Sequence, residues 1–259
     1  MSSSMPPDQV AIEWFFPDRP ELRCGLSLRA GGVSRGLFAS LNLGGSTADR
    51  PEALAENRAR FYRAAGLEPA TAVRMHQVHG TRVVTATEPG DVGEADGLIT
   101  AAFDLCLLAT VADCLPVYLA DPEAGVVGVL HAGWRGVAAG ILQEGVAAAV
   151  RNGARPESLR AMIGPGIGPC CFEVGPDVAA RFPPESLRPG RRERPHVDLP
   201  HAARAELLRA GIPAAAIAGG ERCTRCGSER YFSARSGEPT GRMVAFIVRS
   251  DGGPARSAR

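Results

Sequence analysis

The chain has 259 residues, of which 45% are hydrophobic and 22% charged, as in an ordinary globular protein. Its 29 Lys and Arg against 28 Asp and Glu give a formal net charge of +1. No bulk field therefore steers the chain toward nucleic acid or a membrane surface, and neither is expected as a partner.

From this sequence we expect no signal for export or membrane insertion. No apolar stretch approaches the length of a membrane span, and the polar first eight residues lack the pattern of a secretory signal. An odd count of seven Cys suits reduced thiols in a reducing compartment. We therefore expect a cytoplasmic protein.

The first half of the chain predicts several strands and one helix. Strand-like segments lie at 12–16, 24–29, 72–85 and 104–119. The last of these is rich enough in Leu, Val and Ala to be buried on both faces. A helix is expected to begin near Pro51 and to end at Gly66.

The second half continues the mixture of strands and helices. Strands are predicted at 126–130, 159–163 and 243–248, and helices at 137–150 and 201–210. Gly/Pro-rich 164–169 and Pro/Arg-rich 181–195 are expected to be loops. Without regular βαβ alternation, this order predicts a single α+β domain of mixed β-sheets with surrounding helices. We place it at 9–250, with disordered ends at 1–8 and 251–259.

Two His and one Cys are candidates for a metal site. His79 precedes a glycine, and Cys114 and His131 stand near apolar strands, which hold ligands rigidly. Catalytic zinc typically takes three protein ligands of this N/S kind and keeps a fourth position open. The residues are 35 and 17 positions apart, so the fold must assemble any such site. Taken singly, a His or Cys is more often a packed core residue.

Other interpretations of these residues stay open. A Cys114 thiolate near an imidazole is also a candidate nucleophile. His76 and His79 form an H-x-x-H pair, but on a strand they point to opposite sides. We therefore expect His76 to be structural or at the rim of the cleft.

The remaining cysteines are assigned no function. Cys223 and Cys226 form a C-x-x-C motif, which suits a redox pair or half of a zinc site. No second C-x-x-C and no thioredoxin-like βαβ unit accompanies it. The adjacent pair Cys170-Cys171 is similarly undistinguished.

Candidate anion-binding groups lie beside the same motifs. The Gly-rich segment 163–169 fits neither a P-loop nor a dinucleotide motif, and we expect it to let backbone approach a ligand. Arg29 and Arg135 are candidates for anion binding, although either one suits a surface ion pair equally well. Glu173 adds a nearby carboxylate of unassigned role.

Several motifs together resemble one family. They are Ser27-Leu28-Arg29-Ala30-Gly31-Gly32, Ser40-Leu41-Asn42-Leu43-Gly44, Gln77-Val78-His79-Gly80, Ala112-Asp113-Cys114-Leu115, His131-Ala132-Gly133-Trp134-Arg135-Gly136, Gly164-Pro165-Gly166-Ile167-Gly168-Pro169, Arg222-Cys223-Thr224, Phe232-Ser233-Ala234-Arg235 and Gly241-Arg242-Met243. This set resembles the YfiH-like family, formerly labelled multicopper polyphenol oxidases or laccase-like. The family is now described as purine nucleoside phosphorylases with adenosine deaminase activity.

The resemblance implies a fold, a metal and substrates. The fold would be similar to cysteine hydrolases of the cytotoxic-necrotizing-factor type. Zinc would be held by His79, Cys114 and His131. The substrates would be adenosine, inosine, guanosine and 5′-methylthioadenosine, with phosphate as co-substrate. The family pattern does not include Cys170-Cys171 or Cys226.

The older oxidase label disagrees with the His count. A multicopper relay needs many more imidazoles than a single site, and the chain has five His, two of which are taken by the expected zinc. Copper is expected only as a substitute for zinc at one site, because it outcompetes zinc for N/S ligands.

We therefore predict a zinc-dependent purine nucleoside phosphorylase with adenosine deaminase activity, as a monomer or weak dimer. Zinc deaminases activate a water with the metal and use a carboxylate as proton shuttle, and Asp113 and Glu173 are the candidates. The expected catalytic residues are Cys114, Asp113 and Arg135, with Cys114 also a metal ligand. The residues expected to bind substrate or phosphate are Arg29, Asn42, Gln77, Arg135 and Glu173. Rival hypotheses are a Cys-His hydrolase with Cys114 as nucleophile, a copper polyphenol oxidase, and a non-enzymatic binding protein.

Overall fold

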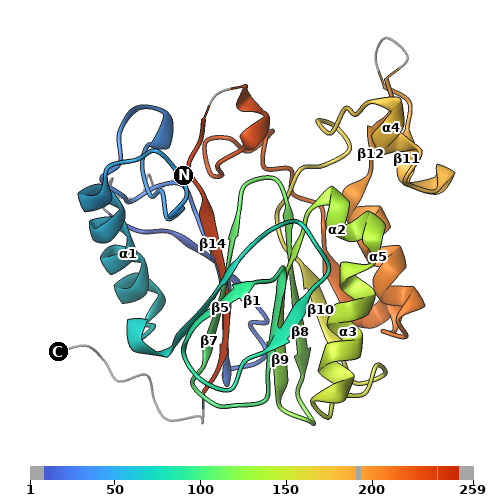
Figure 1. The fold of residues 1–259 in the computed structure, drawn as a ribbon, viewed down its shortest axis with the longest axis horizontal. Helices are drawn as coiled ribbons and strands as arrows, with labels where there is room; N and C mark the ends of the chain where they lie inside the picture. Colours follow the sequence, from blue (N-terminus) through green and yellow to red (C-terminus); the bar gives the residue numbers. More distant parts are fainter. Residues whose placement is uncertain (1–8, 191–193, 238, 251–259) are drawn as a thin grey trace.

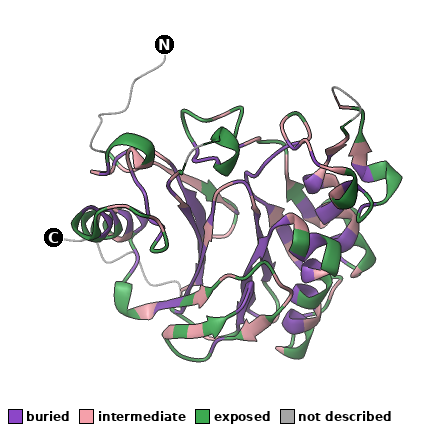
Figure 2. Cartoon of the chain, turned by 45° about the horizontal axis from the view of Figure 1, so that its top comes forward, coloured by how far each residue is buried: buried purple, intermediate pink, exposed green. Residues whose placement is uncertain are grey.

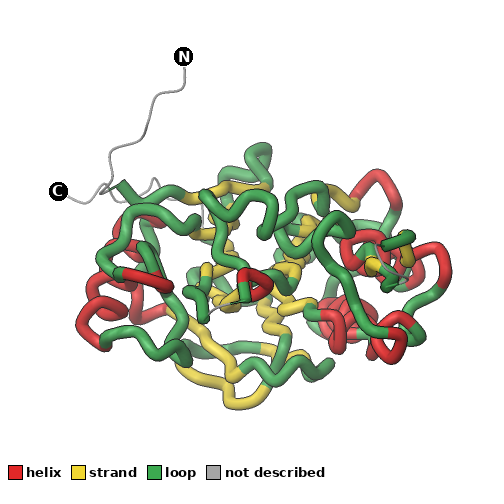
Figure 3. Tube along the Cα trace, turned by 90° about the horizontal axis from the view of Figure 1, so that it is seen from above, coloured by secondary structure: helices red, strands yellow, loops and turns green. Residues whose placement is uncertain are grey.

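The computed structural model describes residues 9–190, 194–237 and 239–250 (Figure 1). The ends predicted to be disordered, 1–8 and 251–259, lie outside the described residues. Two six-stranded sheets lie between α1 (Pro51–Ala65) on one side and a group of helices on the other (Figures 1 and 3). The predicted α+β domain of mixed sheets is therefore confirmed.

The first sheet joins strands from both ends of the chain. Its order is β1 (Ile12–Phe15), β2 (Leu22–Ser27), β14 (Met243–Arg249), β7 (Cys106–Val111), β3 (Ala72–His76) and β5 (Gly90–Glu94). The first four strands pair antiparallel, and β3 pairs parallel with both β7 and β5.

The second sheet comes mainly from the middle of the chain. Its order is β13 (Ile217–Gly219), β10 (Arg160–Ile163), β8 (Leu115–Asp121), β9 (Val126–Ala132), β6 (Gly97–Thr100) and β4 (Val83–Thr85). Its central β8–β9 pair is an antiparallel hairpin. A separate two-stranded sheet pairs β11 (Leu187–Arg188) with β12 (His196–Val197).

The helices on the far side cover the second sheet. They are α2 (Trp134–Ala139), α3 (Ile141–Arg151) and α5 (Leu199–Arg209), whereas the short α4 (Pro176–Ala179) lies beside β11 and β12 (Figure 1). Single 3₁₀ turns occupy Gly36–Phe38, Pro69–Thr71, Pro184–Ser186, Ala214–Ala216 and Ala234–Ser236. None of the helices in the described part of the chain is both long and apolar enough to cross a bilayer.

The central strands of the two sheets, β7, β14, β8 and β9, are mostly apolar and buried because both faces of each sheet are covered there (Figure 2). Along β14, Val244 and Phe246 pack toward α1, whereas Ala245 and Ile247 pack between the two sheets. Successive side chains of a strand point to opposite faces, so one apolar run supplies two cores. The layers therefore form an α/β/β/α sandwich.

Two predicted strand segments each divide into two strands that belong to different sheets. Segment 72–85 contains β3 and β4, and segment 104–119 contains β7 and β8. The prediction of two continuous strands was wrong. At each break a non-glycine residue is left-handed, His79 with φ 61° and Asp113 with φ 79°. Two candidate site residues thus lie in, or next to, crossings between the sheets.

The predicted helix 137–150 is also divided. Its first part begins earlier, at Trp134, and the chain breaks at Gly140 before α3. Gly140 has φ 93° and its N–H donates to the carbonyls of Gly136 and Val137, an ending that favours glycine. The segment 181–195, predicted as a loop, contains one 3₁₀ turn and β11 in its described part.

Candidate active site

The structure brings His79, Cys114 and His131 together. Their ligand atoms all lie within 4.8 Å of one another. His79 comes from the crossing after β3, Cys114 from the crossing before β8, and His131 from β9. The two imidazole rings meet edge to face with centroids 4.8 Å apart. His76 ends β3 and does not belong to this cluster.

One buried carboxylate orients both histidines. Asp96 Oδ1 accepts a hydrogen bond of 2.9 Å from the backbone N–H of His79 and lies 2.8 Å from Nδ1 of His131. Its Oδ2 accepts the N–H of Gly80 at 2.6 Å. Because Nδ1 of His131 is engaged, Nε2 is the ring nitrogen left for a metal, as in carboxylate–histidine–zinc triads. Asp96 was not among the residues predicted from the sequence.

The pKa shifts of Cys114 and His131 favour a thiolate beside an imidazolium in this cluster. Burial raises the pKa of Cys114, but the charge of His131 and hydrogen bonds from both histidines lower it further, to about 6. Burial lowers the pKa of His131, whereas Cys114 and the hydrogen bond to Asp96 raise it to about 9. A thiolate of this kind serves as a metal ligand or as a nucleophile, so both interpretations of Cys114 remain chemically open.

Gly133 has no side chain, and its small size provides the space that the His/Cys cluster occupies. A Cβ atom on Gly133 would lie 3.0 Å from Sγ of Cys114 and 3.0 Å from Cδ2 of His79. The three donors are of the kinds that zinc prefers, and three protein ligands leave a position open to substrate or water. The residues present therefore fit a catalytic zinc ion.

The cluster lines a hollow of about 340 Å³. This volume lies within the usual range for small-molecule sites. Trp134 and Phe172 contribute aromatic walls, and among the described residues Arg235 and Arg242 are its cationic lining groups. Two aromatic walls together with two cations suit a ligand that has both a flat ring and an anionic part.

Asp113 holds the wall of this hollow together. Its Oδ1 accepts the hydroxyl of Thr224 at 2.5 Å, and its Oδ2 accepts the hydroxyl of Ser233 and the N–H of Arg235, each at 3.0 Å. The carboxylate is buried. These contacts favour a positioning role over the proton-shuttle role predicted for it.

The two arginines predicted to bind phosphate lie elsewhere. Arg29 donates to the carbonyls of Ala39 at 2.7 Å and Ser228 at 2.8 Å, which ties three loops together. The exposed Arg135 lies over the ring of Trp134, 4.5 Å from its centroid. Neither of them lines the hollow. The positions of Arg29 and Arg135 therefore do not support the predicted contact with phosphate.

Asn42 and Gln77, predicted to bind substrate, make internal hydrogen bonds. Asn42 is fully buried; its amide donates to Thr47 and Asp49, and its oxygen accepts the N–H groups of Gly44 and Arg242. The hydrogen bond to the N–H of Arg242 joins the loop around Asn42 to the segment that carries Arg242. Gln77 lines the hollow, and its side chain binds the backbone and hydroxyl of Thr110.

Glu173 lines a second hollow, of about 390 Å³, beside the first. The two share Trp134, Phe172 and Arg235 as lining residues. Glu173 lies 3.6 Å from Arg194 and 3.9 Å from His196. Its carboxylate is therefore outside the hollow that holds the His/Cys cluster.

Comparison with known families decides the relationship. The family described as multi-copper polyphenol oxidoreductase laccase matches residues 23–250. The chain belongs to this family, which includes the YfiH and YlmD proteins. It is similar to the purine nucleoside phosphorylase of Deinococcus radiodurans, at 45% identity over 85% of this chain and 86% of that one.

Other relatives carry the same name. The purine nucleoside phosphorylase YlmD of Geobacillus stearothermophilus is 39% identical, over 88% of this chain and 90% of that protein. Its crystal structure superimposes with a TM-score of 0.87, covering 95% of this chain and all of that one, at 35% identity. The crystal structure of YfiH from Bacillus licheniformis gives a TM-score of 0.86 at 30% identity, over 93% of this chain and 96% of that one. The fold and the family predicted from the sequence motifs are confirmed.

Proposed function

We propose that this YfiH-like protein is a zinc-dependent purine nucleoside phosphorylase that also deaminates adenosine. The observation that carries the proposal is the convergence of His79, Cys114 and His131 on a hollow that also holds aromatic and cationic walls. Relatives named purine nucleoside phosphorylase, at 38–45% identity over most of the chain, support it.

His79, Cys114 and His131 are the residues that would hold zinc. When bound, zinc would supply an electrophile with an open coordination position. Asp96 keeps the two histidines in place through its contacts with the His79 backbone and the His131 ring. This arrangement fixes the donors before substrate enters, which a catalytic site requires.

Different walls of the hollow would bind the purine ring and the phosphate. The faces of Trp134 and Phe172 suit a purine ring, and the guanidinium groups of Arg235 and Arg242 suit phosphate. In phosphorolysis, a phosphate oxygen bonds to C1′ of the ribose as the C1′–N9 bond breaks. The purine leaves with the electron pair and takes up a proton. The expected nucleosides are adenosine, inosine, guanosine and 5′-methylthioadenosine.

Deamination of adenosine would use the same hollow. Water replaces the amino group at C6, giving inosine and ammonia. Because Asp113 already accepts three hydrogen bonds, we assign it to positioning. The proton-shuttle role is then left to Glu173, whose carboxylate lines the neighbouring hollow beside Arg194 and His196.

A Cys-His hydrolase is the second candidate, favoured by the lowered pKa of Cys114 beside His131. The polyphenol oxidase is disfavoured, because the one His-containing metal-ligand group among the described residues has only three members. Copper in place of zinc at this site is compatible with the same donors.

The test measures base release from inosine against phosphate concentration, with zinc-loaded protein and a matched Cys114→Ser variant. We expect release that rises to a plateau with phosphate, and a loss of about 100-fold or more in the variant. Base release at an equal rate without phosphate would point to a hydrolase. No release from any of the four nucleosides would overturn the proposal.

A further inference from the structure

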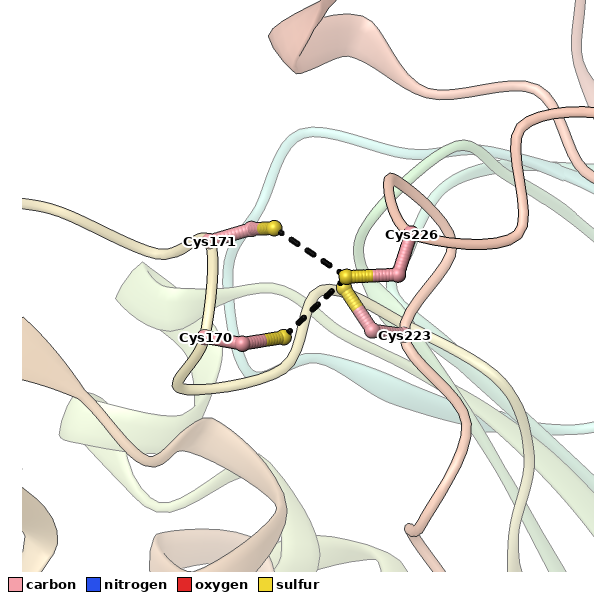
Figure 4. Close-up of side chains that lie close together, drawn as sticks. All are labelled: Cys170, Cys171, Cys223 and Cys226. Carbon is pink, nitrogen blue, oxygen red and sulfur yellow. Dashed lines mark hydrogen bonds between the residues drawn. The ribbon is translucent and has the colours of Figure 1, made fainter.

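Four cysteines from two distant loops meet beside the active site (Figure 4). Cys170 and Cys171 lie in the turn after the Gly/Pro-rich loop, and Cys223 and Cys226 lie in the loop after β13. The sulfur of Cys226 lies 3.5 Å from that of Cys170 and 3.5 Å from that of Cys171. All four sulfur atoms are within 4.8 Å of one another.

These separations match the geometry of one tetrahedral metal ion. Zinc–sulfur bonds of about 2.3 Å in a tetrahedron place the sulfur atoms about 3.8 Å apart. A disulfide needs a separation of about 2.05 Å, and all four cysteines are free. Separations of 3.5 Å to 4.8 Å are therefore too long for disulfide pairs and are compatible with four sulfur atoms around one ion.

Backbone groups favour negative charge on one sulfur of this cluster, that of Cys223. The sulfur of Cys223 accepts backbone hydrogen bonds from Cys226, Gly168 and Arg225. A Cβ atom on Gly168 would lie 3.2 Å from the Cβ of Cys223 and 3.4 Å from the sulfur of Cys170. The glycine thus allows the two loops to approach closely enough for their sulfur atoms to meet.

We propose that Cys170, Cys171, Cys223 and Cys226 bind a second zinc ion in a closed, structural site. Four thiolates complete the tetrahedral coordination and leave no open position, which separates this site from the one at Cys114. Binding releases the thiol protons as the metal–sulfur bonds form and involves no redox change.

The second zinc would fasten two walls of the substrate hollow to each other. Cys171 directly precedes Phe172, which lines the hollow, and Cys223 directly precedes Thr224, whose hydroxyl binds Asp113. The two loops already meet where the N–H of Thr224 donates to the carbonyl of Gly166 at 2.9 Å. Zinc would lock this contact and hold the aromatic wall in place.

Metal content per chain tests the inference, measured by elemental analysis on protein purified with a thiol reductant. We expect two zinc ions in the wild type and one in Cys226→Ser. Cys226 is exposed, so this substitution removes a ligand without opening the core. Ser228→Ala, in the same loop, is the matched control and should keep two. Cys114→Ala should retain one, which separates the two sites.

Cobalt substitution provides a second readout, which is taken first on the wild-type protein. Wild-type protein loaded with cobalt should show the intense thiolate-to-metal charge-transfer bands of a four-thiolate site, and Cys226→Ser should lose most of that intensity. One zinc in both wild type and Cys226→Ser, or a disulfide among these four residues under reducing conditions, would overturn the inference. Loss of zinc in Cys226→Ser but not in Cys114→Ala would uphold it while refuting the proposed active-site metal.

Discussion

The carboxylate of Asp96 lies 2.8 Å from Nδ1 of His131, and both side chains are almost completely buried. The same oxygen accepts the backbone N–H of His79. One aspartate thus sets the position of two proposed zinc ligands from different elements. It also fixes which nitrogen of His131 faces the thiol of Cys114.

Replacing Asp96 should therefore weaken zinc binding without removing a ligand. Asp96→Asn is expected to lower zinc affinity about 10- to 100-fold, the usual cost of losing such a carboxylate partner. Chelator competition in a Cys226→Ser background measures it, because that background has a single proposed site. Asp91→Asn, at an exposed position in β5, is the control. Equal affinities for the two Asn variants would contradict this role.

Each proposed ligand should be needed for the active-site zinc. His79→Ala, Cys114→Ala and His131→Ala should each lose one zinc ion per chain, because two remaining ligands rarely hold zinc tightly. His76→Ala should lose none, since His76 lies outside the cluster. Elemental analysis decides the matter, and wild-type zinc content in Cys114→Ala would refute the assignment.

Arginine variants should separate phosphate binding from structural roles. Arg235→Gln and Arg242→Gln are expected to raise the KM for phosphate about tenfold or more, the cost of a lost charged hydrogen bond. Arg135→Gln should leave it unchanged because Arg135 does not line the hollow. Arg29→Gln should lower the melting temperature, since it loses bonds to two loops. A phosphate effect confined to Arg29 and Arg135 would restore the assignment made from the sequence.

The state of Cys114 distinguishes a ligand from a nucleophile. With zinc bound, Cys114 should react slowly with iodoacetamide, because the metal shields the sulfur. After chelation its labelling should be rapid at pH 7 and should slow as the pH falls through its pKa of about 6, where the thiolate takes up a proton. His131→Ala should react more slowly at pH 7, because the charge that lowers the pKa is gone. Rapid labelling of the zinc-loaded protein with loss of activity would make Cys114 the nucleophile.

Local signals in the sequence predicted much of the fold but not its crossings. Pro51 and Gly66 mark the ends of α1 correctly because both act on the backbone next to them. The left-handed residues at the two breaks, His79 and Asp113, are not glycines, so the backbone reversal was not evident at either position. Because both sheets are covered on both faces, the strands on either side of each break are mostly apolar. Each pair of strands therefore resembles one long strand in the sequence.

The site residues also differ in whether local sequence motifs indicated them or only contacts between distant segments did. Motifs identified His79, Cys114 and His131, whereas Asp96 owes its role to contacts 17 and 35 residues away. Cys171 and Cys226 are 55 residues apart, so the sequence did not indicate that their sulfur atoms meet in the fold. Arg235 and Arg242 stood in matching motifs, but only the structure distinguishes them from Arg29 and Arg135 as lining residues.

The sugar product of the reaction tests the central claim most directly. Zinc-loaded protein is incubated with inosine and phosphate, with Cys114→Ala as the blank. Ribose 1-phosphate is followed by ³¹P NMR, and hypoxanthine and free ribose are followed by liquid chromatography. We predict that hypoxanthine and ribose 1-phosphate appear in equal amounts and that neither appears in the variant. Free ribose in place of ribose 1-phosphate, or unchanged product formation in Cys114→Ala, would contradict the proposed zinc-dependent phosphorylase.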